Sequence, residues 1–367
     1  MGVPYLDMKA QYATVQAELE EAVIDVLRSG TYALGPAVAD FEKSYSDWCD
    51  TKHCIAVNSG TSALHIALLA AGVGPGDEVI TPAMTFVATQ SAVLYCGATP
   101  VLVDIDPVSW QIDPEQVERA ISHKTKAILP VHLHGQMADM RALSSVAESS
   151  NLLLLEDSAQ SHGATQFGRK AGTLGMMGCF SFYPGKNLGA CGEGGAIVTD
   201  DAELANHMRQ MRDWGQTQKY HHELPGFNYR MDAVQGAVLG VKLRKLQEWI
   251  DARRRVAARY EELLSGLPIS LPVQSEGNSH VYHVYSILSD ARDELQKFLG
   301  ASGIGCSVHY PISVDQQTYF KNKVRVCGDL QNAHDIASRA LSLPIFPEMQ
   351  DCQIEEVAEV VHRFFKG

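Results

Sequence analysis

Lys186 and Asp157 are the two residues whose surroundings most clearly indicate chemistry. Lys186 ends the segment Ser-Phe-Tyr-Pro-Gly-Lys at 181–186, and the glycine-rich residues 192–195 follow soon after. Asp157 comes shortly after four leucines at 152–155, which indicate a buried strand. Each residue also has an ordinary explanation, because most lysines are solvated surface groups and an acid after a strand often caps a helix.

Together, a lysine in a turn of small residues and an acid at the end of a strand are the pair that pyridoxal phosphate (PLP) chemistry requires. The lysine can form a Schiff base with the aldehyde of the cofactor. The acid can keep the ring nitrogen of the cofactor protonated, which makes the ring an electron sink. We therefore predict that Lys186 and Asp157 are catalytic residues.

Two further segments could contribute to such a site. Residues 58–64, Asn-Ser-Gly-Thr-Ser-Ala-Leu, join a predicted strand to a predicted helix, and Gly60 allows the tight turn between them. The N–H groups after Gly60 favour an anion at the helix start, although an ordinary Ser or Thr N-cap explains this segment alone more simply. Phe86 follows the next strand. It could stack on a flat cofactor at the carboxyl edge of a parallel sheet, or it could be a core residue.

Other chemistries find less support in the sequence. The glycines at 189–195 precede an apolar strand, whereas a dinucleotide-binding fingerprint leaves a strand and opens a helix. His132 and His134 have no acidic or cysteine partners at ligand spacing, and the same holds for the pair His221-His222, so we predict no metal site. The chain has no Gly-x-Ser-x-Gly motif, which argues against a serine hydrolase.

Length and composition fit a globular enzyme of two domains. The chain has 367 residues, of which 46% are hydrophobic and 20% charged. Its formal charge of −13 argues against nucleic acid as a partner, because nucleic-acid binding depends on positive charge. No stretch reaches the ~18 apolar residues that a membrane span requires, and the first residues lack the pattern of a signal peptide. The eight cysteines are scattered without a Cys-x-x-Cys motif, so we expect a cytoplasmic protein rather than a disulfide scaffold.

The order of the predicted elements indicates an α/β fold. After an amphipathic helix at 13–27, apolar strands alternate with helices, which implies a mostly parallel sheet with helices on both faces. Residues 232–264 keep a helical period throughout, as one kinked helix or as two. We predict a large domain over 1–250 and a small α+β domain over 251–367. The strands are predicted at 53–57, 78–80, 100–104, 126–133, 152–156, 179–182, 196–199 and 281–288.

Several short segments stand in an order along the chain that is typical of a known family. They are Ser59–Ser62, Thr85–Phe86, Glu156–Gly163, Ser181–Lys186 with the glycines at 192–195, and Gly226–Asp232. With them, the chain resembles the DegT/DnrJ/EryC1/StrS family of nucleotide-sugar aminotransferases, which are PLP enzymes with the aspartate aminotransferase (type I) fold. The resemblance extends over nearly the whole chain, and the Lys and Asp motifs are highly specific together.

The resemblance implies a role for each residue of the site. Lys186 would hold PLP as a Schiff base, and Asp157 would pair with the ring nitrogen. Phe86 would stack on the ring, and Gln160 would lie under it. Contacts to the cofactor phosphate are implied for Gly60, Thr61, Ser181 and, from the neighbouring subunit of a homodimer, Asn228. Contacts in the substrate pocket are implied for His162, Tyr310, Arg230 and the loop 216–224 with its Lys219, Tyr220 and His221.

The reaction implied by the resemblance is a ping-pong transamination. Glutamate would leave its amino group on the cofactor and depart as a 2-oxo acid, and a keto-sugar nucleotide would then take up the amine. The freed amine of Lys186 would carry the proton as general acid and base. Residues 219–223, Lys-Tyr-His-His-Glu, resemble those of relatives that act on 3-keto sugars.

Other substrates and reactions stay open at this point. A 4-keto sugar nucleotide or a cyclitol could take the place of the 3-keto sugar. Some relatives that carry His in place of the Schiff-base lysine dehydrate sugars instead, and Lys186 favours aminotransfer over that reaction. A regulator that binds DNA or a ligand without catalysis fits poorly with the acidic balance of the chain.

Overall fold

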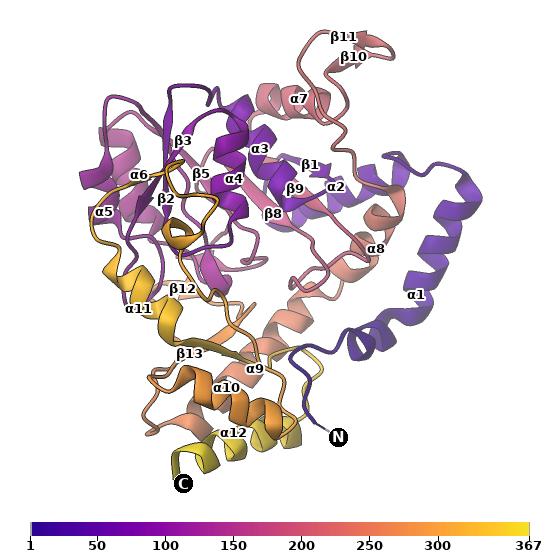
Figure 1. Ribbon diagram of the computed structural model, residues 1–367. Helices are drawn as coiled ribbons and strands as arrows, with labels where there is room; N and C mark the ends of the chain where they lie inside the picture. Colours follow the sequence, from indigo (N-terminus) through magenta and orange to yellow (C-terminus); the bar gives the residue numbers. More distant parts are fainter. Residues whose placement is uncertain (1, 367) are drawn as a thin grey trace.

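The computed structural model describes residues 2–366, which fold around an eight-stranded sheet (Figure 1). Its strand order is β1-β9-β8-β5-β4-β2-β3-β14. Neighbours pair in parallel except at β9, which is antiparallel to β8 and β1. The predicted α/β fold with a mostly parallel sheet is confirmed. The strands are β1 (His53–Val57), β2 (Glu78–Pro82), β3 (Thr99–Val103), β4 (Thr125–Ile128), β5 (Leu153–Asp157), β8 (Met177–Ser181), β9 (Gly195–Thr199) and β14 (Arg325–Val326).

Helices cover both faces of this sheet, because its strands present apolar side chains in both directions. In β1, Ile55 and Val57 join one buried cluster, and Cys54 and Ala56 join the cluster on the opposite face. The first face carries α3 (Gly60–Ala70), α4 (Ala88–Tyr95) and α7 (Ala202–Met211). The second carries α2 (Pro36–Cys49), α5 (Pro114–Ala120), α6 (Met140–Ser149) and α8 (Ala233–Leu243).

The helical stretch predicted at 232–264 is two helices. α8 ends at Leu243, and α9 (Leu246–Leu264) starts after Arg244 and Lys245. Ile250 of α9 packs into the core of the large sheet, whereas Val256 packs into a separate cluster lower in the view of Figure 1. α9 therefore links two hydrophobic cores.

The second core lies in the C-terminal part of the chain. It contains the antiparallel pair β13 (Tyr285–Leu288) and β15 (Ala340–Leu343), covered by α10 (Arg292–Ala301) and α12 (Asp351–Lys366). Val3 packs into this core, and β14 of the same C-terminal region pairs with β3 of the large sheet. The division into two domains at residue 250 therefore stays a proposal. Val3 and β14 each pack against the part of the chain on the other side of this boundary.

The strand predicted at 126–133 is shorter than expected, because β4 ends at Ile128. Pro130 has no N–H to donate, so one hydrogen bond of the ladder is missing there and the strand is interrupted. Pairing with β5 resumes as an isolated parallel bridge between Val131 and Asp157, in which the Asp157 N–H donates to the Pro130 carbonyl at 2.9 Å and the His132 N–H donates to the Asp157 carbonyl at 3.0 Å. The strand predicted at 281–288 likewise begins later, at Tyr285.

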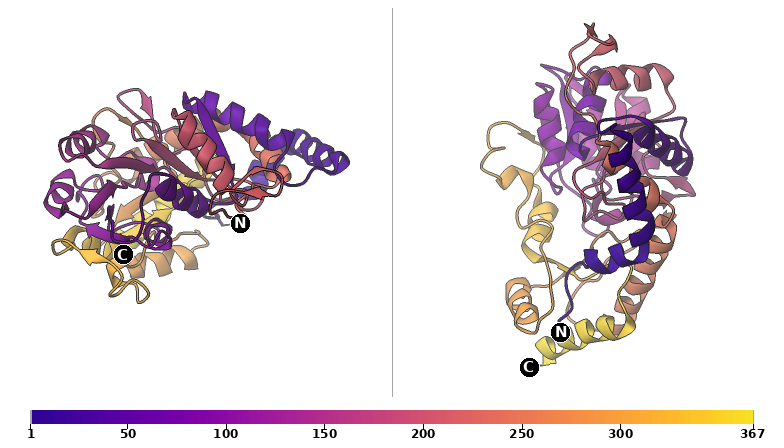
Figure 2. Two further views of the ribbon diagram at one scale, coloured as in Figure 1. Left: turned by 90° about the horizontal axis from the view of Figure 1, so that it is seen from above. Right: turned by 90° about the vertical axis from the view of Figure 1, so that its right-hand side faces the viewer.

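Two segments lie outside this compact body. α1 (Met8–Ser29) runs along its flank, and the hairpin of β10 (Gln216–Gln218) and β11 (His221–His222) projects from the end that carries α7 (Figures 1 and 2). In the described residues, no helix combines the length and apolar character that crossing a bilayer demands. Smaller elements are β6 (Thr165–Gln166), β7 (Arg169–Lys170), β12 (Asn278–Ser279), α11 (Gln331–Arg339) and the 3-10 turns Leu133–Gly135 and Val314–Gln316.

Candidate active site

A cavity of about 790 Å³ opens where the parallel strands end. Segments that follow β1, β2, β5 and β8 line it, which is the edge where open α/β sheets bind ligands. Eight of the residues predicted from the sequence lie together in its wall: Gly60, Thr61, Phe86, Asp157, Gln160, Ser181, Lys186 and Tyr310.

Lys186 reaches the cavity from a turn after β8, in which its N–H donates to the Tyr183 carbonyl at 2.8 Å. Burial disfavours the charged form of the amine and lowers its pKa to about 8, while the negative charge of Asp157 acts in the opposite direction. A lower pKa increases the fraction of neutral amine near neutral pH, and the neutral amine is the nucleophile.

Asp157 is the last residue of β5, and its carboxylate is held at both oxygens. The Thr89 hydroxyl donates to Oδ2 at 2.8 Å, and the Ala159 N–H donates to Oδ1 at 3.2 Å. Burial raises the pKa of this carboxyl, whereas the hydrogen bonds and the charge of Lys186 lower it. The carboxylate therefore has a fixed direction as well as a fixed place.

The neighbouring acid, Glu156, anchors the opposite side of β5. It is fully buried, and its Oε2 lies 2.8 Å from His132 Nε2. The N–H groups of Gly172, Leu174 and Gly175 donate to the same carboxylate at 2.6–2.8 Å. These bonds tie the strand end to two other segments and so fix the position from which Asp157 projects.

The start of α3 combines an ordinary cap with an open anion site. Ser59 is the N-cap, and its hydroxyl accepts from the Ser62 N–H at 3.0 Å, as the simpler explanation predicted. Gly60 and Thr61 still line the cavity, and the first N–H groups of a helix have no partner within it. A Cβ at Gly60 would lie 2.6 Å from Ser181 Cβ, so only glycine lets the helix start approach this serine.

Tyr310 contacts both Gln160 and Phe86 in the lining of the cavity. Gln160 accepts from the His134 N–H at 2.7 Å and donates to the Tyr310 hydroxyl at 3.1 Å. The rings of Phe86 and Tyr310 lie 5.7 Å apart between centroids. Phe86 is 54% exposed, so the alternative of a core residue is wrong and its ring is available to a flat ligand.

His162 was expected in the pocket wall but lies outside it. Its ring packs between Phe180 and Phe182, with centroids at 5.4 and 5.7 Å. The ring nitrogens find no hydrogen-bonding partner among the described residues, and burial lowers the pKa of His162 to about 3. Its side chain supports the two aromatic residues around β8 and does not reach the cavity.

The remaining predicted residues do not line the cavity of their own chain. Asn228 presents its carbonyl to the Asn58 side chain at 3.3 Å. Arg230 pairs with Asp213 at 2.6 Å. The projecting hairpin carries Lys219, Tyr220 and His221, all of them exposed.

Several residues of the site were not recognised in the sequence. Thr89 holds Asp157, and its place on the first turn of α4 gave no signal. Tyr5, Arg253, His283 and His309 also line the cavity. They come from segments far apart along the chain, and no short motif joins them.

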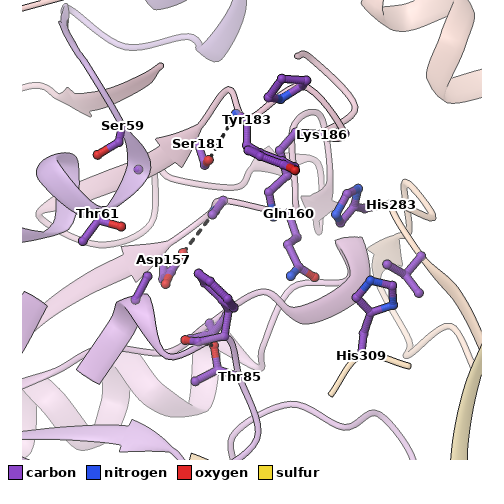
Figure 3. A pocket seen from close by; sticks show the side chains of 18 of the residues that line it. Ser59, Thr61, Thr85, Asp157, Gln160, Ser181, Tyr183, Lys186, His283 and His309 are labelled. Carbon is purple, nitrogen blue, oxygen red and sulfur yellow. Dashed lines mark hydrogen bonds between the residues drawn. The ribbon is translucent and has the colours of Figure 1, made fainter. Parts of the chain in front are cut away.

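The cavity fits pyridoxal phosphate. Figure 3 shows Ser59 and Thr61 at one end, His283 and His309 at the other, and Asp157, Gln160 and Lys186 between them. The helix start at Gly60 and Thr61 suits a phosphate group, and the Phe86 ring suits a flat one. No group of three or more His, Cys, Asp or Glu residues suited to a metal ion occurs within 2–366.

Comparison with known proteins points in the same direction. The DegT/DnrJ/EryC1/StrS aminotransferase family matches residues 13–362. A pleiotropic regulatory protein of Geobacillus stearothermophilus is 45% identical, with 100% of this chain and 99% of the relative covered. A dTDP-3-amino-3,4,6-trideoxy-alpha-D-glucose transaminase of Streptomyces venezuelae is 44% identical, with 99% and 96% covered.

A solved structure extends this likeness to three dimensions. DesV of S. venezuelae in complex with a ketimine intermediate has a TM-score of 0.97 and 43% identity, and the match covers 100% of this chain and 99% of that one. The family match spans most of the chain, and the fold and the cavity agree with it. The chain therefore belongs to the DegT/DnrJ/EryC1/StrS aminotransferase family.

Proposed function

We propose that this PLP-dependent aminotransferase moves an amino group from glutamate to the 3-keto group of a nucleotide-linked hexose. The observation that carries the proposal is the placement of Lys186 and the fixed Asp157 carboxylate in one cavity with an open helix start. The S. venezuelae relative, whose name places the amino group at carbon 3, supports the choice of sugar position.

Most of the predicted residues that line the cavity have a task in this proposal. Asp157 would face the ring nitrogen and favour its charged form. Gly60, Thr61 and Ser181 would bind the phosphate, while Phe86 and Gln160 would lie on the two faces of the ring. Bound in this way, pyridoxal phosphate supplies an aldehyde and an electron-withdrawing ring.

Lys186 would act as the acid and base of the reaction. Its pKa of about 8 lies close to neutral pH, where a group can both accept and return a proton efficiently. Lys186 also argues against the dehydratase alternative, in which a histidine stands at this position.

We also propose a homodimer in which Asn228 and the projecting hairpin serve the partner's cavity. Support comes from the exposed apolar side chains Ile24, Leu27 and Tyr32 on and just after α1, because such a face is usually covered. Tyr220 at the hairpin is 79% exposed, which suits a contact outside its own chain. Lys219 and His221 on the hairpin, together with Arg230, would contact the sugar nucleotide in the partner's cavity.

The proposed compartment is the cytoplasm. All eight cysteines are free, and a reducing environment keeps cysteines in this state. The formal charge of −13 does not exclude the anionic nucleotide sugar and glutamate, because a few local donors suffice to bind them.

The amine of Lys186 gives the first test. In the cofactor-free protein, the rate of covalent PLP capture should rise with pH through a midpoint of about 8, because only the neutral amine attacks. Asp157→Asn should move this midpoint to lower pH, since the negative charge of Asp157 raises the lysine pKa. Stopped-flow absorbance measures the rate, and Nα-acetyl-lysine under the same conditions corrects for the titration of PLP itself.

A midpoint near the ordinary lysine value of 10.5 would contradict the assigned environment of Lys186. A midpoint that Asp157→Asn leaves unchanged would show that the two groups do not interact.

The substrate proposal is tested by separating the two half-reactions. Glutamate alone should convert the bound cofactor and release 2-oxoglutarate, because one site serves the two amine carriers in turn. The converted enzyme should then aminate a 3-keto nucleotide hexose, with the product followed by mass. A 4-keto nucleotide hexose and a keto-cyclitol are the matched comparisons, and preferential amination of either would replace the 3-keto proposal.

Subunit mixing tests the composite site. Lys186→Ala and Asn228→Asp would each impair the homodimer, the second by placing a carboxylate against the phosphate. If Asn228 crosses to the partner, one site of each mixed dimer carries both defects and the other carries neither. Random reassortment should then restore about a quarter of the sites.

Asn228 also lies close to Asn58 of its own chain, so a role within one subunit is the competing explanation. In that case every site keeps one defect, and mixing restores no activity. Native mass spectrometry of differently tagged subunits should accompany the assay, because it shows that the subunits have exchanged.

A further inference from the structure

We propose that Arg253 binds a carboxylate of the amino donor. The inference rests on the proposed function, in which a dicarboxylic amino acid enters the same cavity as the cofactor. It places the binding site of the amino donor at the end of the cavity that carries His283 and His309, where no sequence motif predicted a ligand.

Arg253 is held rigidly in the cavity wall. It lies on α9, is 2% exposed and lines the cavity beside Ile345 and His283. Its Nη1 donates to the carbonyls of Tyr282 at 3.1 Å, His283 at 3.4 Å and Ile345 at 3.0 Å. A guanidinium fixed by main-chain groups on one side loses little further freedom when it binds a ligand on the other.

One part of the guanidinium is left for a ligand. Nη1 is committed to the three carbonyls, and Nε is buried without a partner. Within residues 2–366, Nη2 makes no hydrogen bond to the protein. Unlike Nε, it is not fully buried. Nη2 is therefore the donor that faces the cavity.

The charge of Arg253 also lacks a paired carboxylate. Glu348 lies close enough to influence its pKa, but in the described part of the chain neither carboxylate oxygen of Glu348 has a hydrogen-bonding partner. Burial lowers the pKa of Arg253 to about 10, so the side chain stays charged at neutral pH. A buried cation of this kind gains most from a ligand that brings a negative charge.

Other groups in the described cavity wall are poorly suited to this task. Lys186 is the second cationic side chain that lines it, and its amine is engaged in the reaction itself. Burial lowers the pKa of His309 to about 4 and that of His283 well below its usual value, so both rings are neutral near pH 7. Among the described residues of the wall, Arg253 is therefore the one fixed positive charge besides Lys186 that an entering carboxylate meets.

The position of Arg253 separates the carboxylate from the cofactor phosphate. Its Nη1 touches the main chain of His283, which Figure 3 places at the opposite end of the cavity from Ser59 and Thr61. Asp157 and Lys186 lie between these ends. The phosphate and the donor carboxylate would thus bind at the two ends, with the reacting amine between them.

A purely structural role is the competing explanation, because Arg253 also joins α9 to the segments at 282–283 and 345. Arg254 provides a matched control on the same helix. It donates to the His280 carbonyl at 2.9 Å and to the Ser279 hydroxyl at 2.7 Å, and it does not line the cavity. Arg253→Lys and Arg254→Lys each keep a charge while they lose the planar fork.

The first measurement is the binding of glutarate, which has both carboxylates of glutamate but no amine to react. Isothermal titration of the holoenzyme should give a Kd for Arg253→Lys that is about 10- to 100-fold above the wild-type value, the range expected for a charge-assisted hydrogen bond. Arg254→Lys should bind glutarate within about twofold of the wild type, the scatter expected for a site without direct contact. Equal Kd values for wild type and Arg253→Lys would overturn the proposal.

The second measurement pairs the variant with altered donors. The donor half-reaction is followed with glutamate, its α-amide and its γ-amide, and kcat/KM is compared in the wild type and in Arg253→Lys. For the wild type, one of the two amides should have a much lower kcat/KM than glutamate, because it lacks the carboxylate that Arg253 binds. This difference in kcat/KM should shrink in Arg253→Lys, because the variant has already lost the same interaction. Arg253 would have a structural role instead if Arg253→Lys left both ratios of kcat/KM (glutamate to amide) unchanged and lowered kcat/KM in both half-reactions.

A crystal structure of the wild-type holoenzyme with glutarate keeps the test independent of variant folding. A carboxylate within hydrogen-bonding distance of Arg253 Nη2 supports the proposal, and a carboxylate bound elsewhere, for example by the partner's loop, overturns it. If the wild type reacts with glutamate but Arg253 has no effect on donor discrimination, the donor subsite alone is wrong. A wild type that does not react with glutamate contradicts the proposed function and this inference together.

Discussion

The fixed direction of the Asp157 carboxylate is the constraint on which the rest of the site depends. A carboxylate at the end of a strand would ordinarily rotate, but Thr89 and the Ala159 N–H hold one oxygen each. Its main chain is also paired on both sides, through the Pro130 carbonyl and the His132 N–H. The segment that follows β4 is therefore part of the site, because its bridge from Val131 to Asp157 supplies these partners.

Burial sets the chemistry of the two central residues. The sheet is covered on both faces, so the ends of its strands lie in a medium of low polarity. Burial alone raises the pKa of Asp157 and lowers that of Lys186, and each charge partly offsets the effect on the other. The result is an amine that exchanges its proton near neutral pH, opposite a carboxylate that hydrogen bonds help to keep ionised. The same burial leaves His162 neutral, which suits a packing role between two aromatic rings.

The sequence was informative where a residue's role follows from its neighbours along the chain. Lys186, Asp157 and the start of α3 lie at strand ends, and alternating apolar strands and helices predict that such ends meet at one edge. Phe86 could be placed there too, although only the structure decided that its ring is exposed. Contacts between distant segments could not be predicted in this way. Arg253 faces the cavity because α9 passes beside residues 282–283 and 345, and Thr89 holds Asp157 because α4 packs on the sheet. The prediction that His162 lines the pocket was wrong for the same reason, because its motif indicated its place in the chain but not the direction of its ring.

The central claim is that one lysine, Lys186, holds the cofactor opposite Asp157. Borohydride reduction of the purified holoenzyme, followed by peptide mass mapping, tests this claim directly, because reduction fixes the cofactor to the amine that carries it. The account predicts the label on Lys186 and its loss in Lys186→Ala. Lys242 is a useful internal comparison, because it is also buried and its amine donates to the Gly189 carbonyl at 2.8 Å. A label on Lys242, or on any lysine other than Lys186, would contradict the account.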